Sequence, residues 1–477
     1  MNNKDEWGGF QSMMSRNVSI EVNRASCMVD EPISFCITGL HPQGLYEIVV
    51  EMLDDLGRTW CSNAEFETNN KGELDTAVHS ARSGSYSGIM ANGLFWSMQL
   101  KEQAGELSWG HAHSIPFYMK MSLNPNCYSV KVHEFICAQG DDRNIAKDDS
   151  YKAKTVVAEH SFEMNFIADH VQVIDVTDGF IGQYYMPATK TTTSKDYNKL
   201  PAVIIVGGSG GGFGWSAQIA SVLASRGIAT MAVAYFDYQG SYGLPQELVD
   251  IPLESFECCI DWLQQRAEVD SERIGVVGIS KGAELSLLLG STYHESISSV
   301  VAIAPAHIVM QGISMTNHIP QSSWSYQGEP LAFLPYPDDY TATASFDKSS
   351  LRDIITRALQ NTEAVEQSRI PVERMSANVL LISGDQDEMG PTSDMSSSIQ
   401  NTLSDHSYPY EVKHLRYPDA GHSFFLPNLP AVVFHPNVSP AAVAAAEQHA
   451  WKAILSFLQR AANSHLSKSY PVSNIVK

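Results

Sequence analysis

One serine stands where its hydroxyl could be exposed for chemistry. The stretch RIGVVGISKGAELSLLLG, residues 273–290, changes from an apolar run to a helical pattern at Ser280. Gly278 and Gly282 lie two residues on either side of it, which fits the pattern G-x-S-x-G. So tight a strand-to-helix turn excludes side chains at both glycines and lifts the hydroxyl out of the sheet. We predict that Ser280 is a nucleophile, with the positive end of the following helix aimed at the reaction centre.

A serine hydroxyl needs a base within hydrogen-bond reach before it attacks a carbonyl at neutral pH. His422 is the candidate base, because it follows Gly421 in the loop after a predicted strand. A carboxylate must then hold the imidazole in one tautomer. Asp387 fits this position best, since it ends the motif GDQD after another predicted strand, and Asp385 in the same motif is the alternative.

Backbone donors must stabilise the negative oxygen that forms when the carbonyl is attacked. We expect one donor to be the N–H of Lys281, which directly follows the proposed nucleophile. The other is expected from the glycine-rich sequence GGSGGGFGW, at Ser209 or Gly210. The glycines at 207–212 also suggest a phosphate cradle, but they lack the GK[ST] ending and the full G-x-G-x-x-G spacing. The oxyanion interpretation is therefore favoured.

Several other residues of reactive type are better explained without catalysis. A His-x-His pair has no Cys or His partners nearby, so a solvated strand face is favoured over a metal site, and we expect no metal. One histidine at a strand end could line the pocket or pack in the core or lid. One aspartate near the proposed base fits a loop-capping residue, and two adjacent cysteines fit packing on a helix. These residues are His111 and His113, His307, Asp419, and Cys258 with Cys259.

The three proposed catalytic residues follow the ends of buried strands in the second part of the chain. Unbroken apolar runs alternate there with helical patterns, which predicts a mostly parallel, doubly wound sheet. Ligands bind beyond the carboxyl ends of such strands, and the order serine, acid, histidine is that of an α/β-hydrolase. The strands are predicted at PAVIIVGG, IATMAVAYFDY, RIGVVGI, SSVVAIAP, ANVLLISGD and YEVKHLRYP. The helices are predicted at WSAQIASVLASRG, PLESFECCIDWLQQRA with Pro252 in its first turn, SKGAELSLLLG and PAAVAAAEQHAWKAILSFLQRAA.

Two regions differ from this pattern. Residues 17–167 show period-two alternation, as at 117–122, with turn signals between the alternating runs, which predicts a β-sandwich. Residues 306–372 carry turn residues, aromatics and one helical patch, and they are too long for an ordinary connection. We predict that this segment is a lid inserted in the α/β domain, which extends over 171–465.

Composition narrows the classes of partner and compartment. The chain has 477 residues, 44% of them hydrophobic, which is enough for two or three domains. Its formal net charge is −22 and it has no dense Lys/Arg block, which disfavours nucleic acid and anionic membranes as partners. We see no signal peptide, membrane-spanning run or Ser-Lys-Leu ending, so we expect a cytoplasmic protein. Seven cysteines without CxxC spacing suggest free thiols in a reducing compartment.

The sequence resembles a known family from about residue 20 to 460. The similarity is to the type I acyl-CoA thioesterases and the related bile acid-CoA:amino acid N-acyltransferases. It is carried by VDEPISFCITGLHPQGLYEIVVEMLDDLGRTWCSNAEFETNNKGELDT, GSYSGIMANGLFWSM, GGGFGWSAQIASVLASRGIATMAVAYFDY, IPLESFECCIDWL, GVVGISKGAELSL, IPVERM and YPDAGH. The resemblance implies an immunoglobulin-like N-terminal sandwich packed on an α/β-hydrolase domain. It also implies that Ser280, Asp387 and His422 form the catalytic triad.

The reaction that the resemblance implies is hydrolysis of acyl-CoA through an acyl-enzyme, with no metal or redox cofactor required. The related N-acyltransferases carry cysteine as nucleophile, so Ser280 favours water as the acyl acceptor. The chain departs from the family after the acid, where DEMGPTSDM has Gly390 and Pro391 in place of a tryptophan followed by serine, and also in its lid. The alternatives are acyl transfer to an amino acid, a dienelactone hydrolase-like esterase and a catalytically idle binding protein. The sequence predicts neither the acyl length nor the oligomeric state.

Overall fold

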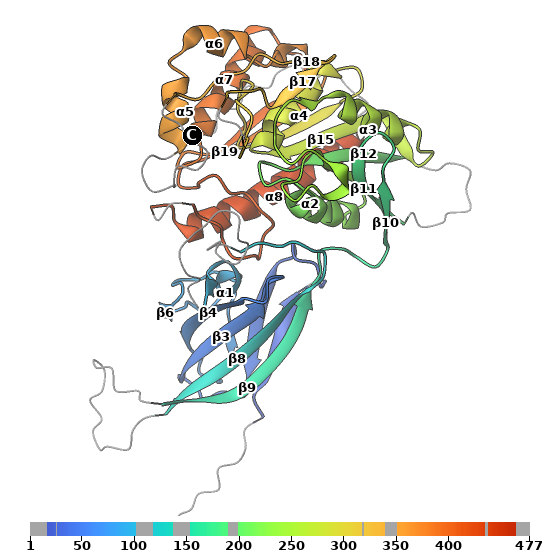
Figure 1. The fold of residues 1–477 in the computed structure, drawn as a ribbon. Coiled ribbons are helices and arrows are strands. Elements are labelled where there is room, and N and C mark those ends of the chain that lie inside the picture. The colour runs from blue at the N-terminus through green and yellow to red at the C-terminus, as the bar shows by residue number, and fades with distance from the viewer. Residues whose placement is uncertain are drawn as a thin grey trace, which may run out of the picture.

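The structure is a computed structural model that describes residues 17–24, 26–101, 118–136, 153–188, 199–316, 319–338, 351–434 and 437–463. An N-terminal part made mostly of β-strands lies beside a larger part in which helices flank a central sheet (Figure 1). The chain passes from the first part to the second after strand β9 (Ala153–Met164).

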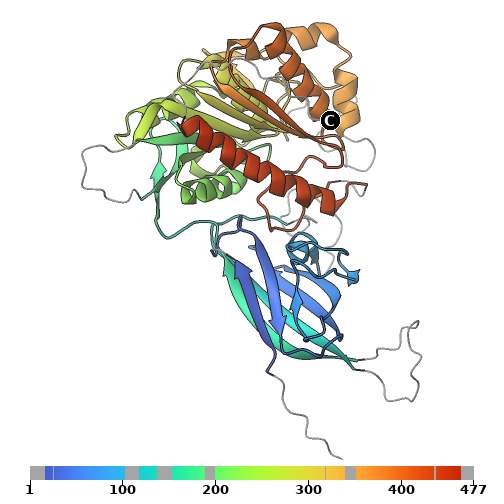
Figure 2. The same ribbon diagram turned by 180° about the vertical axis from the view of Figure 1, so that it is seen from behind.

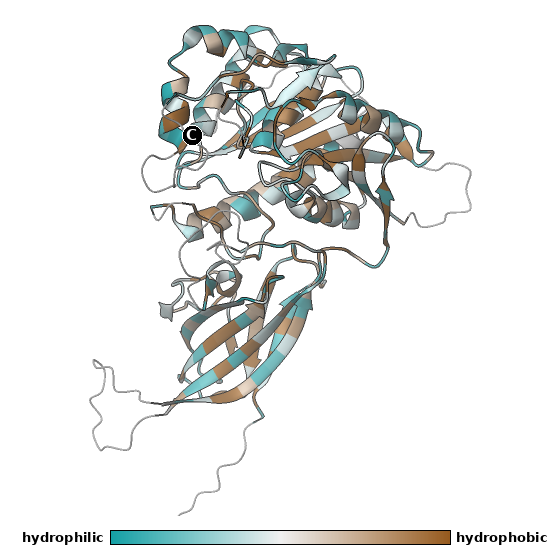
Figure 3. Cartoon of the chain, viewed as in Figure 1, coloured by the Kyte–Doolittle hydropathy of each residue, from teal (hydrophilic) through white to brown (hydrophobic). Residues whose placement is uncertain are grey.

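The N-terminal part contains two antiparallel sheets. Side chains along β4 alternate between buried and half-buried, and such alternation appears as bands of opposite hydropathy in Figure 3. Phe35 of the smaller sheet packs on Phe162 of the larger, with ring centroids 5.9 Å apart, so the two inner faces share one core. The larger sheet has the order β6-β4-β3-β8-β9 with β7 beside β4, and the smaller has the order β1-β2-β5. The elements are β1 (Ser19–Arg24), β2 (Ile33–Thr38), β3 (Leu45–Leu53), β4 (Thr59–Glu67), β5 (Leu74–Asp75), β6 (Ser83–Gly84), α1 (Gly93–Trp96), β7 (Gln99–Leu100), β8 (Asn126–Ile136) and β9.

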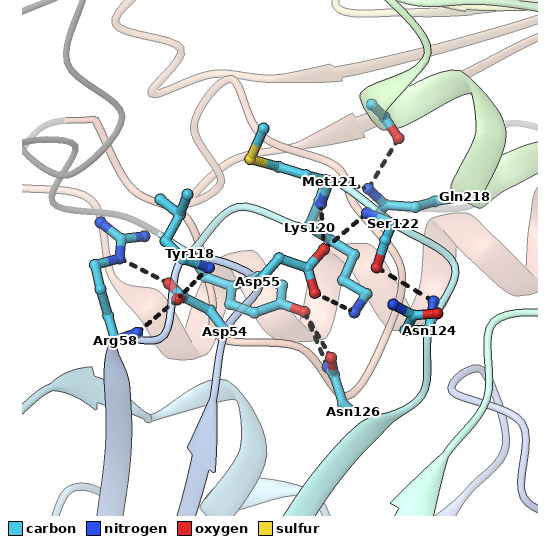
Figure 4. A network of polar contacts seen from close by, with 12 residues as sticks. Asp54, Asp55, Arg58, Tyr118, Lys120, Met121, Ser122, Asn124, Asn126 and Gln218 are labelled. Carbon is cyan, nitrogen blue, oxygen red and sulfur yellow. Dashed lines mark hydrogen bonds and ion pairs between the residues drawn. The ribbon is translucent and has the colours of Figure 1, made fainter.

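One predicted strand of this part is wrong. The alternation at 117–122 predicts a strand, but residues 118–122, its described part, are irregular. They wrap the carboxylate of Asp55, which accepts from Lys120 Nζ at 2.7 Å and from the next two backbone N–H groups at 2.8 and 2.7 Å (Figure 4). Gln218 of the second part donates to the carbonyl of Lys120 at 2.8 Å. Polar contacts at the junction of the two parts therefore hold this segment, and residues 118–122 do not pair with a strand.

An eight-stranded sheet forms the centre of the second part. Its order is β10-β11-β13-β12-β15-β16-β19-β20, in which β11 runs antiparallel to both neighbours and all pairs from β13 onward are parallel. This order is that of the α/β-hydrolase fold, as predicted. The pair β10–β11 was not predicted, because β10 lies at the sheet edge and is exposed along most of its length. The strands are β10 (Val171–Val176), β11 (Ile181–Pro187), β12 (Leu200–Val206), β13 (Ala229–Ala234), β15 (Val269–Ile279), β16 (Ser299–Ile303), β19 (Asn378–Gly384) and β20 (Val412–Tyr417).

Helices cover both faces of this sheet. Val203 and Ile205 of β12 join the core on the side of α2 and α8, whereas Ile204 between them joins the core under α3, α4 and α7. Helix α8 crosses the face turned toward the N-terminal part (Figure 2). The helices are α2 (Gly214–Ser225), α3 (Glu254–Gln264), α4 (Lys281–Thr292), α7 (Thr392–Asp405) and α8 (Pro440–Asn463). No helix of the described ranges is long and apolar enough to cross a membrane.

Two details of the helix predictions change. Helix α3 begins at Glu254, because Pro252 belongs to the short strand β14 (Ile251–Pro252) and does not start the first turn. Helix α7 was not predicted, since its serine-rich sequence has few apolar residues to mark a buried face.

The segment 306–372, predicted as a lid, lies between β16 and β19 along the chain. Its described parts include β17 (Trp324–Tyr326), β18 (Glu329–Pro330), α5 (Leu351–Ala358), α6 (Thr362–Gln367) and the start of a 3-10 turn (Val372–Arg374). Strand β17 pairs with β14 and β18, and α5 packs on α7 through a small apolar core of its own. The lid role and the domain bounds 17–167 and 171–465 stay predictions.

A buried aspartate fastens the two parts together. Asp30 accepts hydrogen bonds from Arg226 Nε at 3.0 Å and Nη2 at 2.5 Å, and from Trp451 Nε1 at 3.1 Å. Arg226 follows α2 and Trp451 lies in α8, the two helices that face the N-terminal part. Asn428 donates to the backbone carbonyls on either side of Asp30, at 2.8 and 2.6 Å. The apolar core also runs on from the sandwich to α2 and α8, so the parts form a continuous packed unit.

We expect Asp30→Ala to lower the free energy of unfolding by about 1–3 kcal/mol, because it removes one of the two carboxylate partners of Arg226, which keeps Glu31 at 2.7 Å, and leaves Trp451 Nε1 without its acceptor among the described residues. Chemical denaturation measures the loss. The matched control is Glu411→Ala, which removes one partner of an exposed ion pair with Arg460 and should cost less than about 1 kcal/mol. Equal losses in the two variants would contradict the role of Asp30.

Candidate active site

Ser280 is held in a strained turn between β15 and α4. Its backbone has φ 56° and ψ −120°, a region that residues other than glycine rarely adopt. A Cβ added to Gly278 would lie 2.0 Å from the carbonyl oxygen of Gly282, and one added to Gly282 would lie 2.3 Å from that of Gly207. The close approach of these backbones is why both positions of G-x-S-x-G need glycine.

His422 and Asp387 form a direct pair beyond the ends of β20 and β19. Nδ1 of His422 lies 3.0 and 2.9 Å from the two carboxylate oxygens of Asp387, which is fully buried. Backbone N–H groups of Met389 and Gly390 donate to the same carboxylate at 2.8 and 3.1 Å, and Thr392 Oγ1 donates at 2.5 Å. These donors hold the carboxylate in place, so that it orients the imidazole through Nδ1 and leaves Nε2 free to accept a proton.

The charge environment favours the protonated imidazole of His422. Burial alone lowers its pKa, but the charge of Asp387 and its hydrogen bond, together with the charge of Glu388, raise the pKa above the ordinary 6.5. Glu388 was missed by the sequence analysis, although it directly follows Asp387 in DQDEM. Its Oε1 accepts from the backbone N–H of Phe434 at 2.9 Å, and burial raises its own pKa. Two carboxyl groups therefore act on one imidazole.

The topology of the sheet places Ser280 beyond the same end of the sheet as this pair. Strands β15, β16, β19 and β20 are successive parallel neighbours, so the residues that follow β15, β19 and β20 gather beyond one end of the sheet. Within the described residues, Ser280 Oγ makes no hydrogen bond to His422. Catalytic hydrogen bonds are often long before substrate binds and tighten in the complex. The structure thus shows the Asp387–His422 pair, and a catalytic triad of this pair with Ser280 remains a proposal.

The glycine loop (residues 207–212) lies against Ser280. A Cβ on Gly208 would be 3.3 Å from Cβ of Ser280, whereas one on Gly210 would meet open space. The backbone N–H groups of Gly208, Ser209 and Gly210 make no hydrogen bond within the described part of the chain. Unpaired N–H groups beside a nucleophile are what an oxyanion site requires.

Lys281, directly after Ser280, is anchored by a buried polar cluster. Its Nζ lies 3.0 Å from a carboxylate oxygen of Glu284 and donates to Ser323 Oγ at 2.6 Å and to the carbonyl of Met310 at 3.1 Å. Glu284 in turn accepts from Trp324 Nε1 at 2.7 Å. Burial lowers the pKa of Lys281 and raises that of Glu284, while their mutual attraction opposes both shifts. The cluster ties the start of α4 to Met310, Ser323 and Trp324 of the predicted lid. The sequence analysis missed it, because only the i, i+3 spacing of Lys281 and Glu284 hints at it.

The remaining sequence candidates make no hydrogen bond to the side chains of His422 or Asp387 in the described part of the chain, or fall outside that part. Asp385, the alternative acid, pairs with Arg416 at 2.5 Å, so Asp387 is the one that contacts His422. The half-buried His307 has a pKa lowered to about 4 by burial, Asp419 is exposed, and of the adjacent cysteines Cys258 is exposed and Cys259 buried. His111 and His113 fall outside the described residues. In the described ranges, no group of three or more His, Cys, Asp or Glu side chains could hold a metal ion.

The fold and this arrangement define an α/β-hydrolase, and comparison with known proteins gives the family. A family model described as "BAAT / Acyl-CoA thioester hydrolase C terminal" matches residues 251–464. A second, described as "Acyl-CoA thioester hydrolase/BAAT N-terminal region", matches residues 30–178. Together they cover well over half of the chain. The chain therefore belongs to the acyl-CoA thioester hydrolase/BAAT family, which confirms the resemblance seen in the sequence.

Individual relatives include enzymes with two different acyl acceptors. Acyl-coenzyme A thioesterase 1 of Mus musculus is 27% identical over 418 residues, which are 87% of this chain and 87% of the mouse protein. Bile acid-CoA:amino acid N-acyltransferase of Mus musculus is 24% identical over 448 residues, which are 91% of this chain and 96% of the mouse protein. Among solved structures, MGS-M1, an alpha/beta hydrolase enzyme from a Medee basin deep-sea metagenome library, is 15% identical and covers 62% of this chain and 100% of its own, with a TM-score of 0.40. Because the thioesterase and the N-acyltransferase are about equally similar to this chain, sequence identity does not decide between hydrolysis and acyl transfer.

We expect Asp387→Asn to lower the pKa of the His422 imidazole, because it removes the charge that favours the protonated ring. Titration of the ¹⁵N-labelled imidazole by NMR measures the change. In the wild type the pKa should lie above 6.5, the ordinary value from which the Asp387 pairing raises it. The control is Asp385→Asn, which breaks the pair with Arg416 and should leave His422 nearly unmoved. The reverse result would make Asp385 the partner of His422.

We expect Lys281→Met to lower the free energy of unfolding by about 3–5 kcal/mol, because it leaves the buried Glu284 carboxylate unpaired. Lys281→Met combined with Glu284→Gln should recover much of this loss, since a neutral amide still accepts from Trp324 Nε1. Denaturation of the single and double variants gives the coupling between the two positions. The control is Lys413→Met at an exposed position of β20, where little change is expected. Additive losses would show that the ion pair does not couple the two residues.

Proposed function

We propose that the protein is a serine acyl-CoA thioesterase that hydrolyses acyl-CoA to a free acid and CoA through an acyl-enzyme on Ser280. The observation that carries the proposal is the Asp387–His422 pair, which stands beyond the same end of the sheet as the strained Ser280. Membership of the acyl-CoA thioester hydrolase/BAAT family supports the substrate class. The serine at the proposed nucleophile position favours water as the acceptor.

The proposed steps follow from the placement of these groups. Ser280 Oγ attacks the thioester carbon while His422 Nε2 takes its proton, and Asp387 stabilises the imidazolium without becoming protonated. The negative oxygen of the tetrahedral intermediate accepts from the N–H of Lys281 and from an N–H of the glycine loop. The intermediate collapses, the C–S bond breaks, and His422 gives its proton to the departing CoA thiolate. Water then attacks the acyl-enzyme with His422 as base, and the acid leaves as Ser280 is regenerated.

The alternative is transfer of the acyl group to the amine of an amino acid. The relatives include a bile acid-CoA:amino acid N-acyltransferase, which makes this acceptor the second candidate. The two reactions share every step up to the acyl-enzyme and differ in what attacks it. Incubation of acyl-CoA with and without glycine or taurine, followed by mass spectrometry of the products, separates free acid from N-acyl amino acid. An esterase of the dienelactone hydrolase type would turn over simple esters in preference to acyl-CoA.

We further propose that the two-sheet N-terminal part is an immunoglobulin-like sandwich, which the family resemblance supports. The segment 306–372 is proposed to act as the lid of the site, because Lys281 beside the proposed nucleophile is bonded to its residues 310 and 323. Arg352 of α5 also donates to the backbone carbonyls of Asp385 and Asp387, at 3.0 and 2.8 Å. The segment thus contacts both the proposed nucleophile turn and the proposed acid loop.

We expect Ser280→Ala to lower kcat for acyl-CoA by several orders of magnitude with the fold retained, because loss of a triad member removes the covalent pathway. Release of free CoA thiol measures turnover, and circular dichroism checks the fold. Ser286→Ala is the matched control, since Ser286 lies in the same helix and its hydroxyl donates only to the carbonyl of Ala283 among described residues. A Ser280→Ala variant as active as Ser286→Ala would reject the proposed nucleophile.

A further inference from the structure

Two tyrosines of one short segment hold the glycine loop. Tyr235 and Tyr238 follow β13, and their hydroxyls donate to the carbonyls of Gly207 at 2.6 Å and of Ser209 at 3.0 Å. Between these carbonyls, that of Gly208 accepts from the loop's own Gly211 N–H at 3.4 Å. Three successive carbonyls of the loop are therefore each held by a donor.

The direction of a carbonyl fixes the direction of the next N–H. In a trans peptide the C=O and N–H bonds lie in one plane and point in opposite directions, and the chain has no cis peptide among its described residues. Turning the Gly207 carbonyl toward Tyr235 aims the N–H of Gly208 the other way. The Ser209 carbonyl and Tyr238 do the same for the N–H of Gly210. Neither of these two N–H groups makes a hydrogen bond to a described residue.

We infer that Tyr235 and Tyr238 are positioning residues, which lock the peptide planes of the glycine loop so that its N–H groups face the oxygen of the reacting carbonyl. This inference rests on the proposed function, in which the loop and Lys281 form the oxyanion site. The loop needs such a lock because glycines leave its backbone free to rotate, and a donor that must be reoriented during the reaction loses much of its effect.

Tyr235 also links the glycine loop to Lys281, the two proposed sources of hydrogen-bond donors to the oxyanion. Its ring centroid lies 5.6 Å from that of Trp324, and Trp324 Nε1 donates to Glu284, the ion-pair partner of Lys281. One buried cluster thus lies behind both the glycine loop and the residue after the nucleophile. Burial raises the pKa of Tyr235 far above its ordinary value, so its hydroxyl remains a donor throughout the working pH range.

The chain offers a matched control for removing a hydroxyl. Tyr242 lies in the same stretch after β13, and its ring packs edge-on against Phe213 of the glycine-rich sequence, with centroids 5.7 Å apart. Its hydroxyl makes no hydrogen bond to a described residue. Tyr242→Phe therefore removes a hydroxyl near the loop without touching its peptide planes. Tyr238, which is partly exposed, can lose its hydroxyl with less risk to the fold than the buried Tyr235.

The experiment compares Tyr235→Phe, Tyr238→Phe and the double variant with Tyr242→Phe and wild type. We expect kcat for acyl-CoA to fall roughly tenfold to a hundredfold in each single lock variant, with KM little changed, because the lost interaction is made to the transition state. Affinity for a trifluoromethyl ketone thioether of CoA, which forms an oxyanion with the serine, should fall by a similar factor. Affinity for the S-alkyl-CoA thioether, which has no carbonyl, should stay the same.

The outcomes distinguish failure of the proposed positioning role of the two tyrosines from failure of the proposed function. If wild type hydrolyses acyl-CoA and the lock variants match Tyr242→Phe in kcat and in ketone affinity, the lock is overturned while the proposed function stands. Equal losses for the ketone and the plain thioether would also overturn it, since they would indicate general damage to the site. If wild type hydrolyses no acyl-CoA, the proposed function fails. The lock is then judged by the rate at which a fluorophosphonate labels Ser280, which should fall in Tyr238→Phe if the lock holds and stay unchanged if it does not.

Discussion

The site depends on one steric constraint, the turn that joins β15 to α4. Gly278, Gly282 and the carbonyl of Gly207 approach so closely that no side chain fits between them, and Ser280 is left with a backbone that only surrounding structure can enforce. Buried parallel strands on either side supply that enforcement, because the Ser280 N–H bonds to the carbonyl of Ile303 at 2.8 Å on the neighbouring strand. The packing of the sheet offsets the strain, which places a half-buried Ser280 at the start of α4.

Much of the second part of the molecule supports this turn from behind. The Lys281–Glu284 pair bonds α4 to the predicted lid, and Trp324 extends the same cluster toward Tyr235 and the glycine loop. A buried ion pair is an expensive way to gain stability, since burial disfavours both charges. This pair instead fixes the local geometry. Lys281 donates to three separate acceptors and Glu284 accepts from three donors, so only one arrangement of the side chains satisfies all of these hydrogen bonds.

The sequence predicted the parallel core of the sheet and the tight turn at G-x-S-x-G well, because unbroken apolar runs and the two glycines depend on burial and local sterics. It could also prefer Asp387 over Asp385 from position alone. It failed where tertiary contacts decide: residues 118–122 alternate as a strand would, yet Asp55 captures their backbone N–H groups. Glu388, Tyr235 and Tyr238 carry no motif, and their roles become visible only when distant segments lie side by side.

The central claim is that the acyl group is carried by Ser280, and trapping the acyl-enzyme tests it most directly. Wild-type protein mixed with acyl-CoA, quenched in acid within the first turnover and digested, would be examined by mass spectrometry for the acylated peptide. The account predicts one acyl group, located on Ser280 in the peptide that contains GISKG, and formed no more slowly than CoA is released at steady state. Turnover with no acyl group on Ser280, or with the acyl group on another residue, would contradict it.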